Sequence, residues 1–237
     1  MRSLSRPVVG VALALALALG ACGAAGDEEA TPREGATANA SEGEAAPVAG
    51  PGRRILAFGN SLFAGYGVGV DKSYPAKLQA ALRERGLNAV VVNAGVSGDT
   101  TAAGRQRLAF TLDAQEEKPD LFILELGGND VLRGLSPDAT RANFEAMLDE
   151  LKRREIPVLL MGMRAPPNYG AEYQRDFDAL YGELAEQYGA DLVPFWLETI
   201  YQQPDLFQSD RIHPTEEGLA KLVTATIDQV EDALPEE

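Results

Sequence analysis

The sequence predicts an α/β protein whose parallel sheet is covered by helices on both faces. Two observations lead to this fold class. Short apolar runs recur along residues 53–237, and segments with helical spacing of apolar residues separate them. Strands that are apolar on both faces are typical of a parallel sheet buried between two helical layers. The composition agrees, since 45% of the 237 residues are hydrophobic and 24% are charged, as in ordinary globular proteins.

Five apolar segments are expected to form the strands of this sheet. They comprise residues 55–58, 89–92, 121–126, 158–161 and 192–195. The third segment is apolar except for Glu125. The fifth contains Pro194, which has no N–H to donate to a neighbouring strand, so this strand is expected at an edge of the sheet.

The helices are predicted by apolar residues spaced three and four positions apart. Ser73 is suited to cap the first helix and Gly86 to end it, while Asp99-Thr100 and Ser136 begin the next two. The apolar stripes are Leu78 and Leu82; Leu108 and Leu112; Phe144, Met147, Leu148 and Leu151; Tyr173, Phe177, Leu180, Tyr181, Leu184 and Tyr188; and Leu219, Leu222, Val223, Ile227 and Val230.

Small and polar residues follow each predicted strand. In open α/β sheets, ligands bind beyond the carboxyl ends of the strands, so these segments are where a functional site is expected. They comprise residues 59–62, 93–99, 127–130, 164–170 and 210–214.

Residues from these segments are suited to acyl transfer. The hydroxyl of Ser61 would be a nucleophile if a base took its proton, and His213, the only histidine, can act as that base near neutral pH. Asp210, three residues earlier, can orient the imidazole. The backbone N–H groups of Ser61 and Gly98 and the amide of Asn129 could stabilise an oxyanion. Each residue alone has an ordinary alternative in a turn or a helix cap; their combination favours catalysis.

The same residues resemble the four conserved blocks of the SGNH (GDSL-type) hydrolase family. The blocks are residues 59–62, Gly98, residues 127–130 and residues 210–213. The sequence is most similar to the family's bacterial thioesterase I, arylesterase and lysophospholipase branch, to which residues 91–101 and 167–170 also correspond. The resemblance extends from residue 55 to about residue 230.

The resemblance implies a flavodoxin-like three-layer α/β/α sandwich with a five-stranded parallel sheet. It implies hydrolysis of acyl or aryl esters, and possible action on thioesters, without a metal or cofactor. It assigns Ser61 as nucleophile, His213 as base and Asp210 as its orienting residue, with Ser61, Gly98 and Asn129 as oxyanion donors. It also implies substrate-flanking positions, which are Val131, Leu132, Arg164, Ala165, Pro166, Asn168 and Tyr169.

The chain departs from the family pattern at Asn60, where the family usually has aspartate. The replacement removes a negative charge beside the nucleophile. Because that aspartate is not a member of the triad, activity is expected to survive. Local hydrogen bonding and the pH profile are the properties that the change affects.

The first 21 residues are expected to be a lipoprotein signal peptide. Arg2 and Arg6 precede an apolar run, residues 8–19, which is shorter than the roughly 20 residues that span a bilayer. The run ends in Leu19-Gly20-Ala21-Cys22, which resembles the bacterial lipobox, in which the cysteine is lipidated.

A tether is predicted between this cysteine and the folded domain. Residues 22–52 are rich in Ala, Gly, Glu and Pro and contain no aromatic residue, so we expect them to be disordered. Residues 53–237 then form a single hydrolase domain. We expect an exported protein anchored in the cell envelope through its lipid, on the periplasmic side of the outer membrane if the cell is Gram-negative.

Charge and rare residues limit the other classes of function. A net charge of −15 repels phosphate backbones and argues against nucleic-acid binding. One cysteine and one histidine exclude a disulfide framework and sites built from several cysteines or histidines. The expected partners are a small-molecule or lipid ester and the membrane, with a monomer as the default state. The alternatives are deacetylation of an envelope polysaccharide and a non-catalytic binding lipoprotein.

Overall fold

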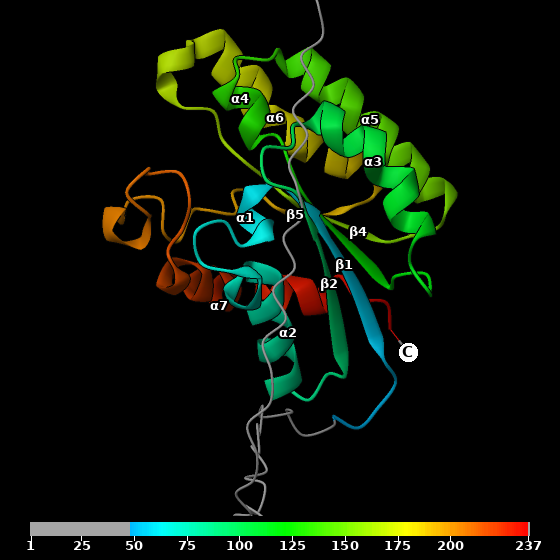
Figure 1. The fold of residues 1–237 in the computed structure, drawn as a ribbon. Coiled ribbons are helices and arrows are strands. Elements are labelled where there is room, and N and C mark those ends of the chain that lie inside the picture. The colour runs from blue at the N-terminus through cyan, green and yellow to red at the C-terminus, as the bar shows by residue number, and fades with distance from the viewer. Residues whose placement is uncertain (1–47, 237) are drawn as a thin grey trace, which may run out of the picture. The chain divides into compact units, whose positions relative to one another are not determined.

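The computed structural model describes residues 48–236, and its five strands form one parallel sheet (Figure 1). The signal peptide, Cys22 and most of the predicted tether lie outside these residues. The strands are β1 (Arg53–Gly59), β2 (Ala89–Gly95), β3 (Leu121–Glu125), β4 (Val158–Met161) and β5 (Asp191–Val193). Their order is β2-β1-β3-β4-β5, which is the flavodoxin-like order that the family resemblance implies.

Helices cover both faces of the sheet, as predicted. The layer on one face contains α2 (Tyr74–Glu84) and α7 (Glu216–Asp232). The layer on the other contains α3 (Thr101–Asp113), α5 (Pro137–Arg153) and α6 (Ala171–Tyr188) (Figure 1). The shorter elements are α1 (Ser61–Ala64), α4 (Gly128–Leu132) and the 3₁₀ turns η1 (Val70–Lys72), η2 (Pro167–Tyr169) and η3 (Pro204–Leu206). No helix within residues 48–236 combines the length and the apolar character needed to cross a membrane.

Strand β1 shows why its apolar run is continuous. Ile55 and Ala57 pack into the core beneath α2 and α7, whereas Leu56 and Phe58 pack into the core beneath α3, α5 and α6. All four side chains are buried. Burying a large aliphatic side chain contributes about 1.5–3 kcal/mol to folding, so a polar residue at any of these positions would be costly.

The boundaries of four predicted strands differ from the structure. Strand β1 extends from Arg53 to Gly59, and β3 ends at Glu125. Strand β5 ends at Val193 and leaves Pro194 outside, although its predicted place at the sheet edge is confirmed. Strand β2 continues to Gly95, because its last residues pair in parallel with the end of β1, where Gly95 is opposite Gly59. The pairing with β1 therefore keeps the segment from Asn93 to Gly95 in the strand, although its polar sequence predicted that the strand would end before it.

The predicted helix caps mostly form. Ser73 accepts a hydrogen bond from the Ala76 amide, and Ser136 accepts one from the Ala139 amide. Helix α3 is capped by Thr100, not by Asp99, whose carboxylate has a different partner. The last helix is capped by Thr215.

Candidate active site

Ser61 lies directly beyond the end of β1 and is the first residue of α1. The chain forms a short helix here, which the sequence analysis did not predict. Asn60 caps it, with its side-chain oxygen 2.9 Å from the Leu62 nitrogen. The amides of the first helical turn have no partner within the helix, so the Ser61 N–H remains free to act as a donor. A Cβ atom at Gly59 would lie only 2.8 Å from a Glu125 carboxylate oxygen, so the end of β1 requires glycine.

The structure brings Ser61, His213 and Asp210 together, although 152 residues separate the serine from the histidine. Ser61 Oγ lies 2.8 Å from His213 Nε2. On the other side of the ring, His213 Nδ1 lies 2.7 Å from Asp210 Oδ2. The ring of Tyr66 lies against the imidazole, with centroids 4.2 Å apart. This is the arrangement of nucleophile, base and orienting carboxylate that activates a serine.

Asp210 is fixed in place by the turn that contains it. Its Oδ1 atom accepts hydrogen bonds from the amides of Ile212 and His213, while Oδ2 faces the imidazole. Burial by itself would raise the pKa of Asp210, but these amides and the imidazole outweigh it and lower the pKa to about 2. Asp210 is therefore ionised across the physiological range.

Gly98 and Asn129 lie on neighbouring segments of the same sheet edge. Gly98 has a φ of +87°, and its N–H has no hydrogen-bond partner within residues 48–236. Asn129 lies in α4, a helix that the sequence analysis did not predict, and its Nδ2 donates to the Asp99 carbonyl oxygen at 2.8 Å. Two donor groups thus lie at the cavity that contains Ser61.

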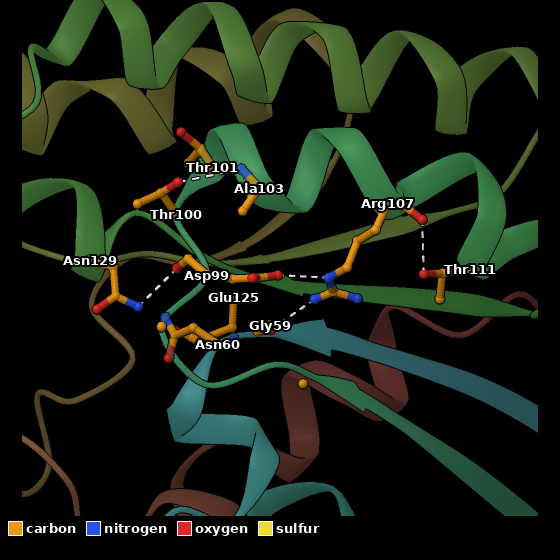
Figure 2. Close-up of polar contacts among 12 residues, drawn as sticks. Gly59, Asn60, Asp99, Thr100, Thr101, Ala103, Arg107, Thr111, Glu125 and Asn129 are labelled. Atoms are coloured by element: carbon orange, nitrogen blue, oxygen red, sulfur yellow. Dashed lines mark hydrogen bonds and ion pairs between the residues drawn. The ribbon is translucent and has the colours of Figure 1, made fainter. Parts of the chain in front are cut away.

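Arg107 joins these segments from α3 (Figure 2). Its Nε lies 2.6 Å from Asp99 Oδ2, its Nη2 donates to the Gly59 carbonyl oxygen at 3.0 Å, and its guanidinium carbon stacks 3.7 Å from the centre of the Phe58 ring. Arg107 therefore connects the end of β1 to the segment that carries Gly98.

A buried carboxyl group lies next to Asn60, the residue that precedes Ser61. Glu125, at the end of β3, is fully buried and accepts two hydrogen bonds from Asn60. Burial raises the pKa of Glu125 to about 8, although the two donors of Asn60 act in the opposite direction. The sequence analysis noted this residue only as the polar exception in an apolar strand.

A cavity of about 660 Å³ opens beside Ser61, a volume typical of small-molecule sites. Of the substrate-flanking positions that the sequence suggested, Val131, Leu132, Arg164 and Pro166 line it. Ala165, Asn168 and Tyr169 are not among its lining residues: Ala165 is buried in the core, and Tyr169 packs against Tyr173.

The sequence analysis did not predict the other residues that line this cavity. Most of them come from the segment between β5 and α7, which contributes Leu197, Tyr201, Gln202, Pro204 and Phe207. The only feature of the sequence that could have indicated this part of the cavity is a group of apolar residues between β5 and α7. Their spacing matches neither a strand nor a helix. Within residues 48–236, no three His, Cys, Asp or Glu side chains are grouped so that they could hold a metal ion.

Comparison with known proteins adds an independent observation. Residues 57–221 match the model of the GDSL-like Lipase/Acylhydrolase family. The chain is 40% identical over 165 residues to an arylesterase of Vibrio mimicus, which covers 70% of this chain and 82% of the relative. It is 41% identical over 160 residues to esterase TesA of Pseudomonas aeruginosa, with 68% and 79% covered. The solved structure of AlinE4, an SGNH-hydrolase family esterase, is 61% identical and covers 79% of this chain and 100% of its own, with a TM-score of 0.67.

Proposed function

Because this chain belongs to the GDSL-like lipase/acylhydrolase family and is a carboxylic ester hydrolase, we propose that it cleaves short- to medium-chain acyl and aryl esters through an acyl-enzyme on Ser61. The observation that carries this proposal is the hydrogen-bonded line from Ser61 through His213 to Asp210, with distances of 2.8 and 2.7 Å. A serine aligned in this way can lose its proton as it attacks a carbonyl carbon.

The first half of the reaction acylates the serine. Ser61 Oγ attacks the ester carbonyl carbon while His213 Nε2 takes the hydroxyl proton, and Asp210 stabilises the imidazolium that forms. The N–H groups of Ser61 and Gly98 and the amide of Asn129 stabilise the oxyanion. The intermediate then collapses, the bond to the leaving oxygen breaks, and His213 gives its proton to the departing alcohol or phenol.

The second half regenerates the enzyme. Water attacks the acyl carbon while His213 takes one of its protons, and the same donors stabilise the second oxyanion. The bond to Ser61 Oγ breaks and the serine recovers its proton from the imidazole, releasing the carboxylic acid. A thioester can follow the same path, with a thiol as the leaving group.

The walls of the cavity favour an apolar acyl or aryl group. Its lining includes Leu132, Met163, Leu197, Phe207 and Ile212. Leu132 and Ile212 are also partly exposed, so an apolar surface continues from the cavity to solvent. This supports esters with a hydrophobic acyl chain, including lysophospholipids.

The location of the protein is part of the same proposal. We propose that Cys22 carries a lipid and that residues 22–52 tether the domain to the cell envelope, where lipid esters are available. Incorporation of a labelled fatty acid into the wild type, and its loss in Cys22→Ser, would test the anchor. Labelling of the variant would contradict it.

The activity is tested with p-nitrophenyl esters from acetate to palmitate. The protein expressed from its full sequence should hydrolyse them with an optimum at short to medium chains, and Ser61→Ala should lose turnover while it retains its thermal stability. Unchanged turnover in Ser61→Ala would contradict the mechanism. Hydrolysis of p-nitrophenyl acetate but of no longer ester, together with release of acetate from acetylated glycans, would favour a polysaccharide deacetylase.

A further inference from the structure

Glu125 and Asn60, both labelled in Figure 2, form a buried pair, and Asn60 directly precedes the proposed nucleophile. The Asn60 backbone nitrogen donates to Glu125 Oε2 at 3.1 Å, and its side-chain Nδ2 donates to Oε1 at 2.9 Å. Both side chains are nearly inaccessible to solvent, with exposed fractions of 2% for Asn60 and 0% for Glu125. Water therefore does not compete for these hydrogen bonds, and losing either would leave a buried polar group unpaired.

The other end of the Asn60 amide faces the nucleophile. Oδ1 accepts a hydrogen bond from the Leu62 amide at 2.9 Å and lies 3.4 Å from Ser61 Oγ. An asparagine side chain has one end that donates and one that accepts. Because both oxygens of Glu125 accept from Asn60, the donating end of the amide faces Glu125 and the accepting end faces Leu62 and Ser61.

We propose that Glu125 is a positioning residue for Ser61, a role that rests on the function proposed above. It holds the Asn60 amide in the orientation that caps α1 and thereby sets the place of the Ser61 hydroxyl. The reversed amide would direct its N–H groups at the Leu62 amide, which is itself a donor. Helix α1 would lose its cap, and the serine at its first position would lose its fixed distance to His213.

The same arrangement shows what asparagine at position 60 changes relative to the family's usual aspartate. Ser61 Oγ is nearer to His213 Nε2, at 2.8 Å, than to Asn60 Oδ1, at 3.4 Å, so its proton is available to the base. An ionised carboxylate at position 60 would compete for that proton through a charge-assisted hydrogen bond. It would also face the Glu125 carboxylate, and two carboxyl groups so close cannot both ionise freely.

Three variants test the proposal: Glu125→Gln, Asn60→Asp and the double variant. Glutamine at 125 cannot accept at both ends, so one bond to Asn60 is lost. In the double variant the glutamine can donate to the new carboxylate and accept from the backbone N–H of residue 60, while the other carboxylate oxygen accepts from Leu62. Both hydrogen bonds of the pair are then restored, and only the one between the two side chains has its direction reversed.

The readouts are the rate constant of Ser61 labelling by a fluorophosphonate, and kcat and KM for p-nitrophenyl butyrate. Misplacement of reacting groups by about 1 Å can cost about 10²-fold, so Glu125→Gln should reduce labelling and kcat by about tenfold or more with little change in KM. The double variant should recover most of this loss. Tyr74→Phe, which removes a buried hydrogen bond to Thr226 away from the site, is the control for lost stability alone.

Two results would overturn the proposal. One is Glu125→Gln labelled at the wild-type rate; the other is a double variant no faster than Glu125→Gln. Ser61→Ala separates this inference from the proposed function: wild-type ester turnover that persists in Ser61→Ala rejects the mechanism, whereas serine-dependent turnover unaffected by Glu125→Gln rejects only the positioning role.

If Glu125→Gln does not fold, the Asn60→Asp variant alone tests whether Glu125 positions Ser61. Its labelling rate relative to wild type should fall as pH rises from 6 to 9, because the two carboxyl groups then lose their shared proton. The other groups around the pair are the Ser61–His213 couple, Arg107 at the Gly59 carbonyl and the Tyr181 hydroxyl from α6, all of which the wild type shares. A ratio that does not change with pH would contradict the proposal.

Discussion

The side chain of Asn129 donates a hydrogen bond to the main-chain oxygen of Asp99, with Nδ2 and the oxygen 2.8 Å apart. An amide nitrogen carries two hydrogens, so this bond leaves one for a substrate oxygen. The bond also joins α4 to the segment that carries Gly98 (Figure 2). Asp130 strengthens the junction, since its carboxylate accepts from the Thr101 amide at 2.9 Å. The proposed oxyanion donors are therefore held at a fixed spacing before any substrate binds.

Asn129→Asp should lower kcat by about 10²–10³-fold with little change in KM, because a carboxylate has the size of the amide but cannot donate to the oxyanion. Steady-state kinetics with p-nitrophenyl butyrate would show this. Asn143→Asp is the matched control on α5, where the side chain contacts Thr101 and not the cavity. A wild-type kcat in Asn129→Asp would exclude the amide as an oxyanion donor.

Asp210→Asn should reduce kcat by about 10³-fold or more while the fold remains intact. The amide can present its nitrogen to His213 Nδ1, which selects the tautomer that cannot accept the serine proton. Asp205→Asn, which changes an exposed carboxylate in the same segment, should retain the wild-type rate. Equal rates for the two variants would show that Asp210 does not orient the base.

Arg107→Ala should destabilise the protein by about 2 kcal/mol or more, because it leaves Asp99, whose side chain is only 12% exposed, without its charged partner. It should also lower kcat, since the end of β1 and the Gly98 segment lose their connection. Urea denaturation measures the first effect and ester hydrolysis the second.

The control for Arg107 is Arg154→Ala, which removes ion pairs to Glu150 and Asp113 at the protein surface. Pairs of this kind contribute about 0–1 kcal/mol each, so the loss of stability should be smaller. Equal losses in the two variants would contradict a special role for Arg107.

The stability of the protein should depend on pH through Glu125. Its pKa is raised to about 8 in the folded chain from an ordinary value of 4.5, so the folded state retains a proton that the unfolded state has already released. This contribution is complete below pH 4.5 and is lost as pH rises through 8. The free energy of unfolding should fall by up to about 1.4 kcal/mol per pH unit between these values.

Urea denaturation at several pH values would measure this slope, and Glu125→Gln should lack it. The difference between the two proteins isolates Glu125 from other titrating groups. Burial raises the pKa of the neighbouring Tyr181 hydroxyl well above its usual value, so that group stays neutral over the whole range. Identical slopes would show that Glu125 ionises in the folded state as it does in water.

The sequence alone determined most of the secondary structure and singled out the residues proposed to react. Helix starts at Ser73 and Ser136 were predicted because a cap depends on a few adjacent residues. Buried strands were predicted because their apolar runs are local. The order Ser61, Asp210, His213 was recognised as a motif, and the structure places these residues within hydrogen-bonding distance of one another.

Only the tertiary structure decided which side chains support that motif. Glu125 meets Asn60, 65 residues away, because the parallel register of β1 and β3 sets Gly59 beside Glu125. Arg107 reaches the Gly59 carbonyl across 48 residues because α3 packs on that face of the sheet. The segment between β5 and α7 forms part of the cavity wall, but its apolar residues have no regular spacing from which the sequence could predict this. Such contacts depend on register and packing between distant segments, whereas caps and strand patterns depend on neighbouring residues.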